Sequence, residues 1–302
     1  MTSNKPLSKQ RGDNYVLARD YKSASRLNYE HYLWRESLGY DLHPTILQYL
    51  SELSINHDKN SDVGSSIGDD IDNENNHGPS PPIRIADIAC GTAIWLHHVS
   101  RLLPHAQLDG YDISLAQCPP QQWLHSNIRL REWDLFTEPE PDMLAAYDVV
   151  HVRLLFVVVR AENPEPILEN LKRLLKPGGY IQWDELSVSQ SFILRTGDDV
   201  KAPLMERRVG GMKGLGMWVG ELGKWMERSG FGDVRGWEVE EREGLARAFF
   251  DNHLAKDREM GEGRGGEDGK EGLRGVEGIY EESKGGAVIC TPKIVWTGRK
   301  GW

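Results

Sequence analysis

The stretch that decides the fold is IADIACGTA, residues 85–93. The short apolar run 83–88 predicts a strand, the small residues after it predict a tight turn, and a helix is predicted over 95–103. Small residues let the backbone approach a ligand closely, and the free N–H groups at a helix N-terminus face that ligand. This unit is therefore a candidate ligand-binding site, with an ordinary turn after a strand as the alternative.

Strands and helices alternate downstream of this unit. The pattern predicts further strands over 106–111, 128–132, 147–152, 180–183, 231–239 and 293–297, and helices over 166–175 and within 202–230. The helix 166–175 ends at a Pro-Gly-Gly sequence, which is a helix-stop signal. Alternation of this kind is typical of an α/β fold, and we expect a doubly wound, mostly parallel sheet.

The segments before this alternation differ in composition. Residues 15–53 predict two or more helices, interrupted by a glycine and a proline, whereas 1–14 is polar and predicted to be disordered. Residues 54–82, rich in Asp, Asn, Ser and Gly, predict a flexible linker before the main domain, 83–302.

One segment inside the main domain, 257–286, is full of glycine and glutamate. We predict a disordered insertion here, because such a composition offers little to bury. Composition equally allows an artefact of the gene model, such as a retained intron. In that case the region after the fifth strand would be incomplete.

Composition and charge narrow the class of protein. The 302-residue chain carries 46 acidic and 36 basic residues, a net charge of -10, which argues against general nucleic-acid binding. Its three cysteines form no CxxC pair, so neither a metal site nor a disulfide framework is expected. The N-terminus lacks the apolar core of a signal peptide, and the apolar run 149–159 is too short to span a membrane. We expect a cytoplasmic protein, with the nucleus as an alternative, and leave its oligomeric state open.

Two acidic residues follow predicted strands at informative places. Asp112 closes the second strand, 25 positions after Asp87 (112 minus 87), where an acid can accept both hydroxyls of a ribose. Asp134, in WDLF after the third strand, can accept from an adenine amino group while a neighbouring aromatic covers the ring. The alternatives are a solvated strand-end acid for Asp112 and a turn or N-cap aspartate for Asp134.

Together these motifs carry a family resemblance. DxACGTA, an acid closing strand two, WDLF, YDVVHVR and LLKPGGY stand in the order and spacing that resemble class I S-adenosylmethionine-dependent methyltransferases. With RDYKSASRLNYEHYLW and GYDLHP near the N-terminus, the chain is similar to fungal small-molecule methyltransferases of secondary metabolism. The resemblance implies a Rossmann-like, doubly wound, mostly parallel seven-stranded sheet with an N-terminal helical lid, S-adenosylmethionine as cofactor and a small-molecule acceptor as partner.

The resemblance also implies roles for single residues. Asp87 would organise the first turn near the methionine amino group, Asp112 would bind the ribose, and Asp134 would contact adenine. The full set of cofactor contacts implied in the main domain is Asp87, Ala89, Gly91, Asp112, Ile113, Asp134 and Leu135. In the lid segment, Tyr15, Arg19 and Tyr21 would cover the methionine end. An ordinary amphipathic helix packed on the sheet is the alternative reading of that segment.

The first turn departs from the family pattern. Ala89, Gly91 and Ala93 stand where the family usually has Gly-x-Gly-x-Gly, so only the middle glycine remains. The same departure argues against a nicotinamide-dependent oxidoreductase, whose fingerprint requires a third glycine for helix packing. Trp95 fills the corresponding stretch here.

Methyl transfer is an in-line displacement that depends on proximity and alignment, and a general base is needed only when the acceptor must lose a proton. His151, at the end of strand four, is the best candidate base, with Asp184 and Glu185 as others; a structural role is the alternative for His151. The acceptor atom stays open between O, N, S and C. A regulatory, partner-binding protein related to methyltransferases is the alternative function.

Overall fold

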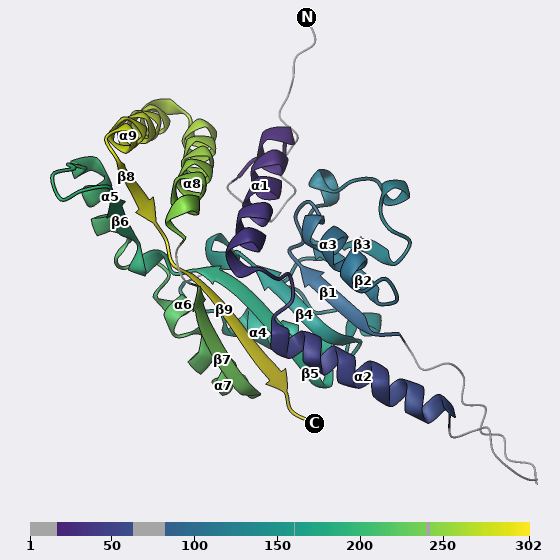
Figure 1. Ribbon diagram of the computed structural model, residues 1–302. Coiled ribbons are helices and arrows are strands. Elements are labelled where there is room, and N and C mark those ends of the chain that lie inside the picture. Colours follow the sequence, from purple (N-terminus) through teal and green to yellow (C-terminus); the bar gives the residue numbers. More distant parts are fainter. Residues whose placement is uncertain (1–16, 63–81, 160, 240–241) are drawn as a thin grey trace, which may run out of the picture.

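A seven-stranded sheet runs through the computed structural model, which describes residues 17–62, 82–159, 161–239 and 242–302 (Figure 1). Its strands are β1 (Arg84–Ile88), β2 (Gln107–Asp112), β3 (Ile128–Glu132), β4 (Tyr147–Arg153), β5 (Leu175–Leu186), β7 (Phe231–Val239) and β9 (Lys293–Lys300). The helices are α1 (Tyr21–Leu38), α2 (Pro44–Asp62), α3 (Ile94–Leu102), α4 (Glu165–Leu174), α5 (Pro203–Met212), α6 (Met217–Gly220), α7 (Leu222–Arg228), α8 (Glu243–Arg264) and α9 (Gly266–Lys284).

The order of strands across the sheet is β3-β2-β1-β4-β5-β9-β7. The strands from β3 to β5 pair in parallel, while β9 pairs antiparallel with both β5 and β7. The chain winds outward to one side from β1 and to the other side from β4, so the topological switch point lies between these two strands. Ligands of doubly wound sheets bind at the carboxyl ends of the strands at this point. The predicted α/β, mostly parallel seven-stranded sheet is confirmed.

Helices cover both faces of the sheet, and the apolar run of β4 shows why. Successive residues of a strand point to opposite faces. Val149 belongs to the core cluster under α2 and α3, whereas Val150 and Val152 belong to the cluster under α4 and α7. A strand buried on both sides needs apolar residues on both faces, and this requirement explains the valines of YDVVHV. Its two polar side chains are buried and paired, Asp148 with Lys176 and His151 with Asp87.

The N-terminal segment forms two helices, as predicted. The side chain of Asp20 caps the N-terminus of α1, and Gly39 ends that helix in the left-handed conformation, with φ of 76°. Pro44 starts α2, which continues to Asp62. The predicted linker therefore begins too early, since 54–62 is helical: adding turns to an existing helix is easier than starting one. The remainder of the predicted linker up to residue 81, and the N-terminal segment 1–14, lie outside the described residues.

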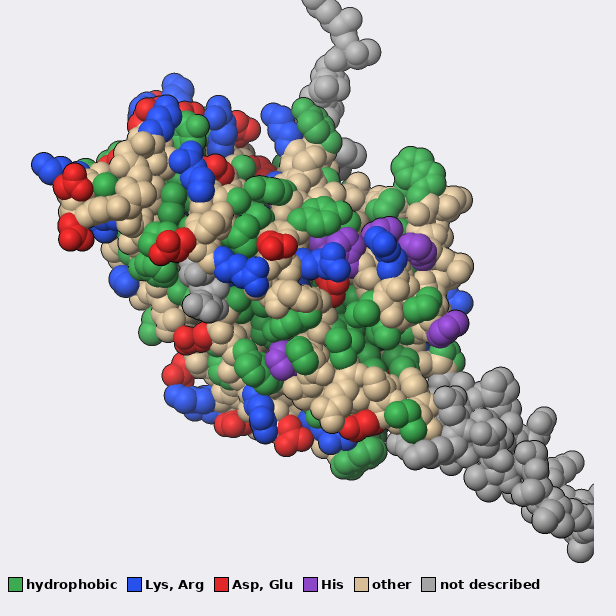
Figure 2. Space-filling view, viewed as in Figure 1, with side chains coloured by type: hydrophobic (Ala, Val, Ile, Leu, Met, Phe, Trp, Pro, Cys, Tyr) green, Lys and Arg blue, Asp and Glu red, His purple; other side chains and the backbone are tan. Residues whose placement is uncertain are grey.

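The segment predicted to be a disordered insertion, 257–286, is helical, and the prediction was wrong. It supplies the end of α8 and all of α9, which pack side by side (Figure 1). A Cβ on Gly269 would lie 2.7 Å from the carbonyl oxygen of Gly261, so glycines allow the two helices to approach closely. On the exposed side, Arg258 pairs with Glu262 and Glu277, and basic and acidic side chains alternate over these helices (Figure 2). In the sequence, both the many glycines and the many charged residues of this segment had been interpreted as signs of disorder.

A second, smaller sheet completes the C-terminal region. β6 (Phe192–Arg195) and β8 (Ala287–Cys290) pair antiparallel, and α5, α8 and α9 share a hydrophobic cluster with them. The sequence pattern did not predict this sheet. Figure 1 shows α1 standing between α8 and α3. In the described part of the chain, no helix has the combination of length and hydropathy that crossing a membrane would require.

Candidate functional site

A cavity of about 410 Å³, here called the first cavity, opens at the carboxyl ends of β1, β2 and β4, beside the switch point. Of the residues expected to contact a cofactor, those that line it are Arg19, Asp87, Ala89, Gly91, Asp112, Ile113, Asp134 and Leu135. Tyr21 does not: it lies at the start of α1 with 76% of its surface exposed, and the structure corrects that expectation. Tyr15 lies outside the described residues.

The first turn keeps the backbone conformation of a glycine turn although two of its glycines are replaced. Ala89, Gly91 and Ala93 have φ of 58°, 56° and 60°, all in the left-handed region. An L-residue other than glycine pays about 1–2 kcal/mol for this conformation. The N–H of Ala93 donates to the carbonyl of Cys90 at 2.8 Å, closing the turn directly before α3. The turn is thus held in a strained shape that leaves only small side chains toward the cavity.

Asp112 is fixed by the turn that it faces. Its Oδ2 accepts from the N–H of Gly91 at 2.9 Å and its Oδ1 from the N–H of Ser114 at 3.1 Å. Burial raises the pKa of this carboxyl, and the two backbone donors work against that rise. Each carboxylate oxygen has a second lone pair, so the group can still accept hydrogen bonds from a ligand in the cavity.

The loop after β3 forms the neighbouring wall. Oδ1 of Asp134 accepts from the N–H of Phe136 at 3.0 Å, so the turn role that was the alternative for Asp134 is realised while the residue also lines the cavity. Trp133 and Leu135 are buried beside it. Among the described residues, Nε1 of Trp133 has no hydrogen-bond partner. The wall therefore combines apolar surface with a carboxylate and an indole N–H.

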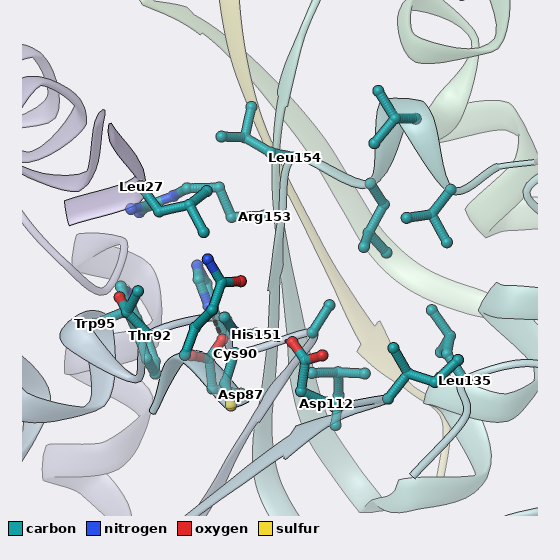
Figure 3. Close-up of a pocket in the computed structure, with 18 of the residues that line it drawn as sticks. Leu27, Asp87, Cys90, Thr92, Trp95, Asp112, Leu135, His151, Arg153 and Leu154 are labelled. Atoms are coloured by element: carbon teal, nitrogen blue, oxygen red, sulfur yellow. Dashed lines mark hydrogen bonds and ion pairs between the residues drawn. The ribbon is translucent and has the colours of Figure 1, made fainter. Parts of the chain in front are cut away.

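His151 lines the cavity close to Asp87 (Figure 3), and the carboxylate of Asp184 lies on the other side of its ring. Its Nδ1 is 2.8 Å from Oδ1 of Asp87, its Nε2 is 3.3 Å from Oδ2 of Asp184, and Trp95 stacks on the ring at 3.9 Å. Burial lowers the pKa of His151, but the two carboxylates outweigh burial and raise it. A protonated ring that donates through both nitrogens has no lone pair for a substrate proton. This geometry favours the structural alternative for His151.

Arg153 completes this charged group, and the sequence analysis gave it no role. Its Nη2 and Nε donate to Oδ2 of Asp184 at 2.6 and 2.9 Å. Burial raises the pKa of Asp184, but the charges of Arg153 and His151 lower it overall. Two cationic side chains, His151 and Arg153, therefore alternate with two anionic ones, Asp87 and Asp184. The charges of this buried row cancel. The signal available in the sequence was the position of Arg153, which ends the YDVVHVR motif.

Helix α1 covers this row from above. Leu27, Glu30 and His31 lie at i, i+3 and i+4 of one helix face and line the first cavity, and none of them was singled out from the sequence. Leu27 points in from α1 near Arg153 (Figure 3). The part of α1 that lines the first cavity therefore consists of residues other than Tyr21.

In a comparison with known protein families, residues 86–181 match a family described as a methyltransferase domain. This matching stretch, 86–181, is called the methyltransferase domain below, after the family that it resembles. The chain is 38% identical over 128 residues to methyltransferase grgD of a Penicillium species, covering 38% of this chain and 44% of that protein. It is 35% identical over 107 residues to N-methyltransferase tcpN of Claviceps purpurea, covering 35% and 38%.

A regulator appears among the relatives as well. Secondary metabolism regulator laeA of Coprinopsis cinerea is 30% identical over 102 residues, covering 34% of this chain and 24% of that protein. The matches thus span less than half the length of these curated relatives.

A second cavity of about 660 Å³ lies beside the first, and most of its lining comes from residues after the methyltransferase domain. Its walls are α1, α5, α8, α9, β8 and the 3₁₀ turn Leu155–Val157. Glu185, one of the alternative candidate bases, faces this cavity, and burial raises the pKa of its carboxyl to about 8. The sequence analysis did not identify this cavity.

His31, His98 and Asp41 form a buried cluster next to the methyltransferase domain's first turn, with ligand atoms within 4.8 Å of one another. Nδ1 of His31 accepts from Nη1 of Arg153 at 3.3 Å, so the proton of the neutral ring sits on Nε2. That Nε2 lies 3.3 Å from Nδ1 of His98 and donates to it. Burial lowers the pKa of His31 to about 2 and also lowers that of His98, which keeps both rings neutral. The cluster is thus a hydrogen-bonded pair of histidines that joins α1 to α3.

Proposed function

We propose that the chain is an S-adenosylmethionine-dependent methyltransferase that acts on a small molecule in fungal secondary metabolism. The observation that carries this proposal is the convergence of Asp87, Asp112 and Asp134 on the first cavity, around a left-handed turn within the methyltransferase domain. The named methyltransferases among the relatives support it. We expect the cytoplasm, because the three cysteines, all of them among the described residues, form no disulfide with one another.

The residues of the first cavity fit the proposed cofactor. A volume of about 410 Å³ is in the range of small-molecule sites. Asp112 keeps lone pairs for the ribose hydroxyls, and the carboxylate of Asp134 with the apolar side chain of Leu135 suits the adenine ring. Asp87 would hold the amino group of the methionine end, and Arg19, which lines the same cavity, its carboxylate.

The bound cofactor would supply an electrophilic methyl group. The protein's contribution is alignment and exclusion of water. Leu27 and Leu154 close the cavity with apolar side chains from α1 and from the segment after β4. The row of His151, Asp184 and Arg153 holds Asp87 in a fixed place, because His151 donates to it at 2.8 Å.

A regulatory role that works through partner binding is the second candidate function. The likeness to the laeA regulator favours it. Cofactor binding is compatible with both roles, so the discriminating measurement is transfer of a labelled methyl group to a small molecule.

The test of cofactor choice is calorimetric titration of the purified protein with S-adenosylmethionine and S-adenosylhomocysteine, with NAD and NADP as controls. We expect micromolar binding of the two sulfur compounds and none of the controls. Failure of both sulfur compounds to bind would contradict the proposal, and binding of NAD alone would make the first turn a dinucleotide site.

A further inference from the structure

The N-terminal end of α1 and the residues before it are held by one side chain of α8, which stands beside α1 (Figure 1). Oε1 of Glu259 accepts from the N–H of Ala18 at 2.6 Å and from the hydroxyl of Ser23 at 2.5 Å, and its Oε2 accepts from Nε of Arg26 at 3.2 Å. Hydrogen bonds to an ionised acceptor are stronger than bonds between neutral groups. Three donors of the stretch 18–26 thus converge on one carboxylate that lies at least 233 positions away in the sequence.

Arg19 stands between two fixed points of this stretch. On one side, the N–H of Ala18 is held by Glu259. On the other side, Asp20 caps α1, and its Oδ1 accepts from the N–H of Ser23 at 3.0 Å. Arg19 itself lines the first cavity. The contact between Ala18 and Glu259 therefore helps to set the place from which Arg19 reaches that cavity.

The rest of α1 is anchored independently of Glu259. Its residues Leu33 and Trp34 share a hydrophobic cluster with Phe249 of α8. In the middle of the helix, Oδ1 of Asn28 accepts from the hydroxyl of Thr92 at 2.6 Å, which joins α1 to the first turn. These contacts do not involve the stretch 18–26. Removing the carboxylate of Glu259 should therefore free the beginning of α1 and the residues before it, while the remainder of the helix stays in place.

We propose that Glu259 is a positioning residue for the cofactor site: by holding Ala18 and Ser23, it places Arg19 at the first cavity. This inference rests on the function proposed above, in which Arg19 holds the carboxylate of the methionine end. No residue of α8, all of which the structure describes, lines the first cavity, so Glu259 acts through Arg19 and not by contact with the cofactor. Glu259 also lies in the glycine- and glutamate-rich segment 257–286, which thereby contributes to cofactor binding.

Two ligands distinguish this role from a general effect on the fold. S-adenosylhomocysteine and 5′-methylthioadenosine share the adenine, the ribose and the thioether sulfur, but only the first carries the amino and carboxylate groups. Calorimetric titration of the full chain measures both. Glu259→Ala should weaken binding of S-adenosylhomocysteine at least tenfold and leave the affinity for 5′-methylthioadenosine within twofold of wild type. An equal loss for both ligands, or a loss for neither, would overturn the inference.

A double-mutant cycle tests whether Glu259 acts through Arg19. Arg19→Met should also weaken binding of S-adenosylhomocysteine at least tenfold. In the Arg19→Met background, the further substitution Glu259→Ala should have no additional effect, because the side chain that Glu259 places is already absent. If the two losses multiplied in the double variant, Glu259 would act by another route and the inference would fall.

Two further variants serve as controls. Glu262→Ala removes a carboxylate of the same helix that pairs with Arg258 on its exposed side, and it should bind S-adenosylhomocysteine as wild type does. Glu259→Gln keeps an oxygen that can accept from Ala18 and loses the charge, so its affinity should lie between those of Glu259→Ala and wild type. It also carries the test if urea unfolding shows that Glu259→Ala is not folded. An affinity of Glu259→Gln no higher than that of a folded Glu259→Ala would contradict the role of this acceptor.

The titration of wild type separates this inference from the proposed function. If S-adenosylhomocysteine fails to bind wild type, the proposed function falls and the role of Glu259 with it. If it binds wild type and Glu259→Ala equally well, only the role of Glu259 falls.

Discussion

The two cavities of this protein differ in how their buried titratable groups are held. In the first, Asp87, His151, Asp184 and Arg153 are held as a paired row of ions. In the second, burial shifts Glu185 and His253 toward their neutral forms. The first cavity is built from consecutive strand ends, and the second from helices far apart in the chain. The first cavity thus rests on one row of paired ions, whereas the second combines ion pairs such as Arg26–Glu30 with groups that burial shifts toward their neutral forms.

Removing one ion from the row should have the largest effect on stability. Arg153→Met leaves Asp184 buried without its main partner, and breaking a buried pair in this way costs about 3–5 kcal/mol. Urea titration of Arg153→Met and of wild type measures this loss as a difference in the free energy of unfolding. Arg258→Met, at an exposed pair on α8, is the control and should cost at most about 1 kcal/mol. Similar values for both variants would mean that the row is not a buried charge network.

The neutral state of the second cavity predicts a pH dependence. The pKa of Glu185 is about 8 in the folded protein and near 4.3 in the unfolded chain, so the wild type loses stability as pH rises between these values. Glu185→Gln stays neutral, and its stability relative to wild type should grow by about 2 kcal/mol from pH 5 to pH 7. The exposed Glu169→Gln should show no such growth. If the difference in stability between Glu185→Gln and wild type did not change with pH, the carboxyl of Glu185 would be ionised in the folded protein.

The elements that flank the two cavities also differ in how tightly they are packed. A Cβ on Gly110, in β2, would lie 2.6 Å from Leu130 Cδ2 and from Leu96 Cδ1. Gly110→Ala should therefore cost about 1–3 kcal/mol, because the packed neighbours must move. Gly210→Ala, in the open helix α5, should stabilise by up to about 1 kcal/mol. Thermal unfolding compares them, and two changes of the same sign would contradict the packing described.

The strain in the first turn gives the smallest expected effect. Ala89 is exposed at φ of 58°, so Ala89→Gly should stabilise by about 0.5 kcal/mol, the relief of strain less the added flexibility of the unfolded chain. Ala93 has the same conformation, but its methyl group is buried, and losing it costs about 0.8 kcal/mol. Ala93→Gly should therefore bring no gain. Urea unfolding of Ala89→Gly and Ala93→Gly measures both effects. If Ala89→Gly brought no gain in stability, the turn would not be strained.

The sequence predicted the first cavity because its residues lie next to recognisable strands. Asp112 and Asp134 each follow a strand of the parallel sheet, and parallel strands end on one edge, so local patterns sufficed to bring them together. His151 lies within β4, which continues to Arg153, and its role depends on Asp87 and Asp184 on two other strands. Pairing across strands is not visible in a local motif.

The second cavity could not be predicted in this way. Its residues come mainly from α1, α5, α8, α9 and β8, and the segment 257–286, which forms the end of α8 and all of α9, was expected to be disordered because of its glycines and glutamates. Glycine breaks a helix in isolation but permits close packing when another helix lies against it, as Gly269 and Gly261 do. That contact is tertiary, and composition carries no information about it.

Calorimetric titration of S-adenosylhomocysteine into Asp112→Ala and Gly211→Phe tests the division of labour between the cavities most directly. We predict that Asp112→Ala weakens binding at least tenfold, about 1.4 kcal/mol, because it removes the anchored carboxylate of the first cavity. Gly211→Phe, at a residue that lines the second cavity and not the first, should leave the affinity unchanged. Wild-type affinity in Asp112→Ala, or an equal loss in both variants, would contradict the account.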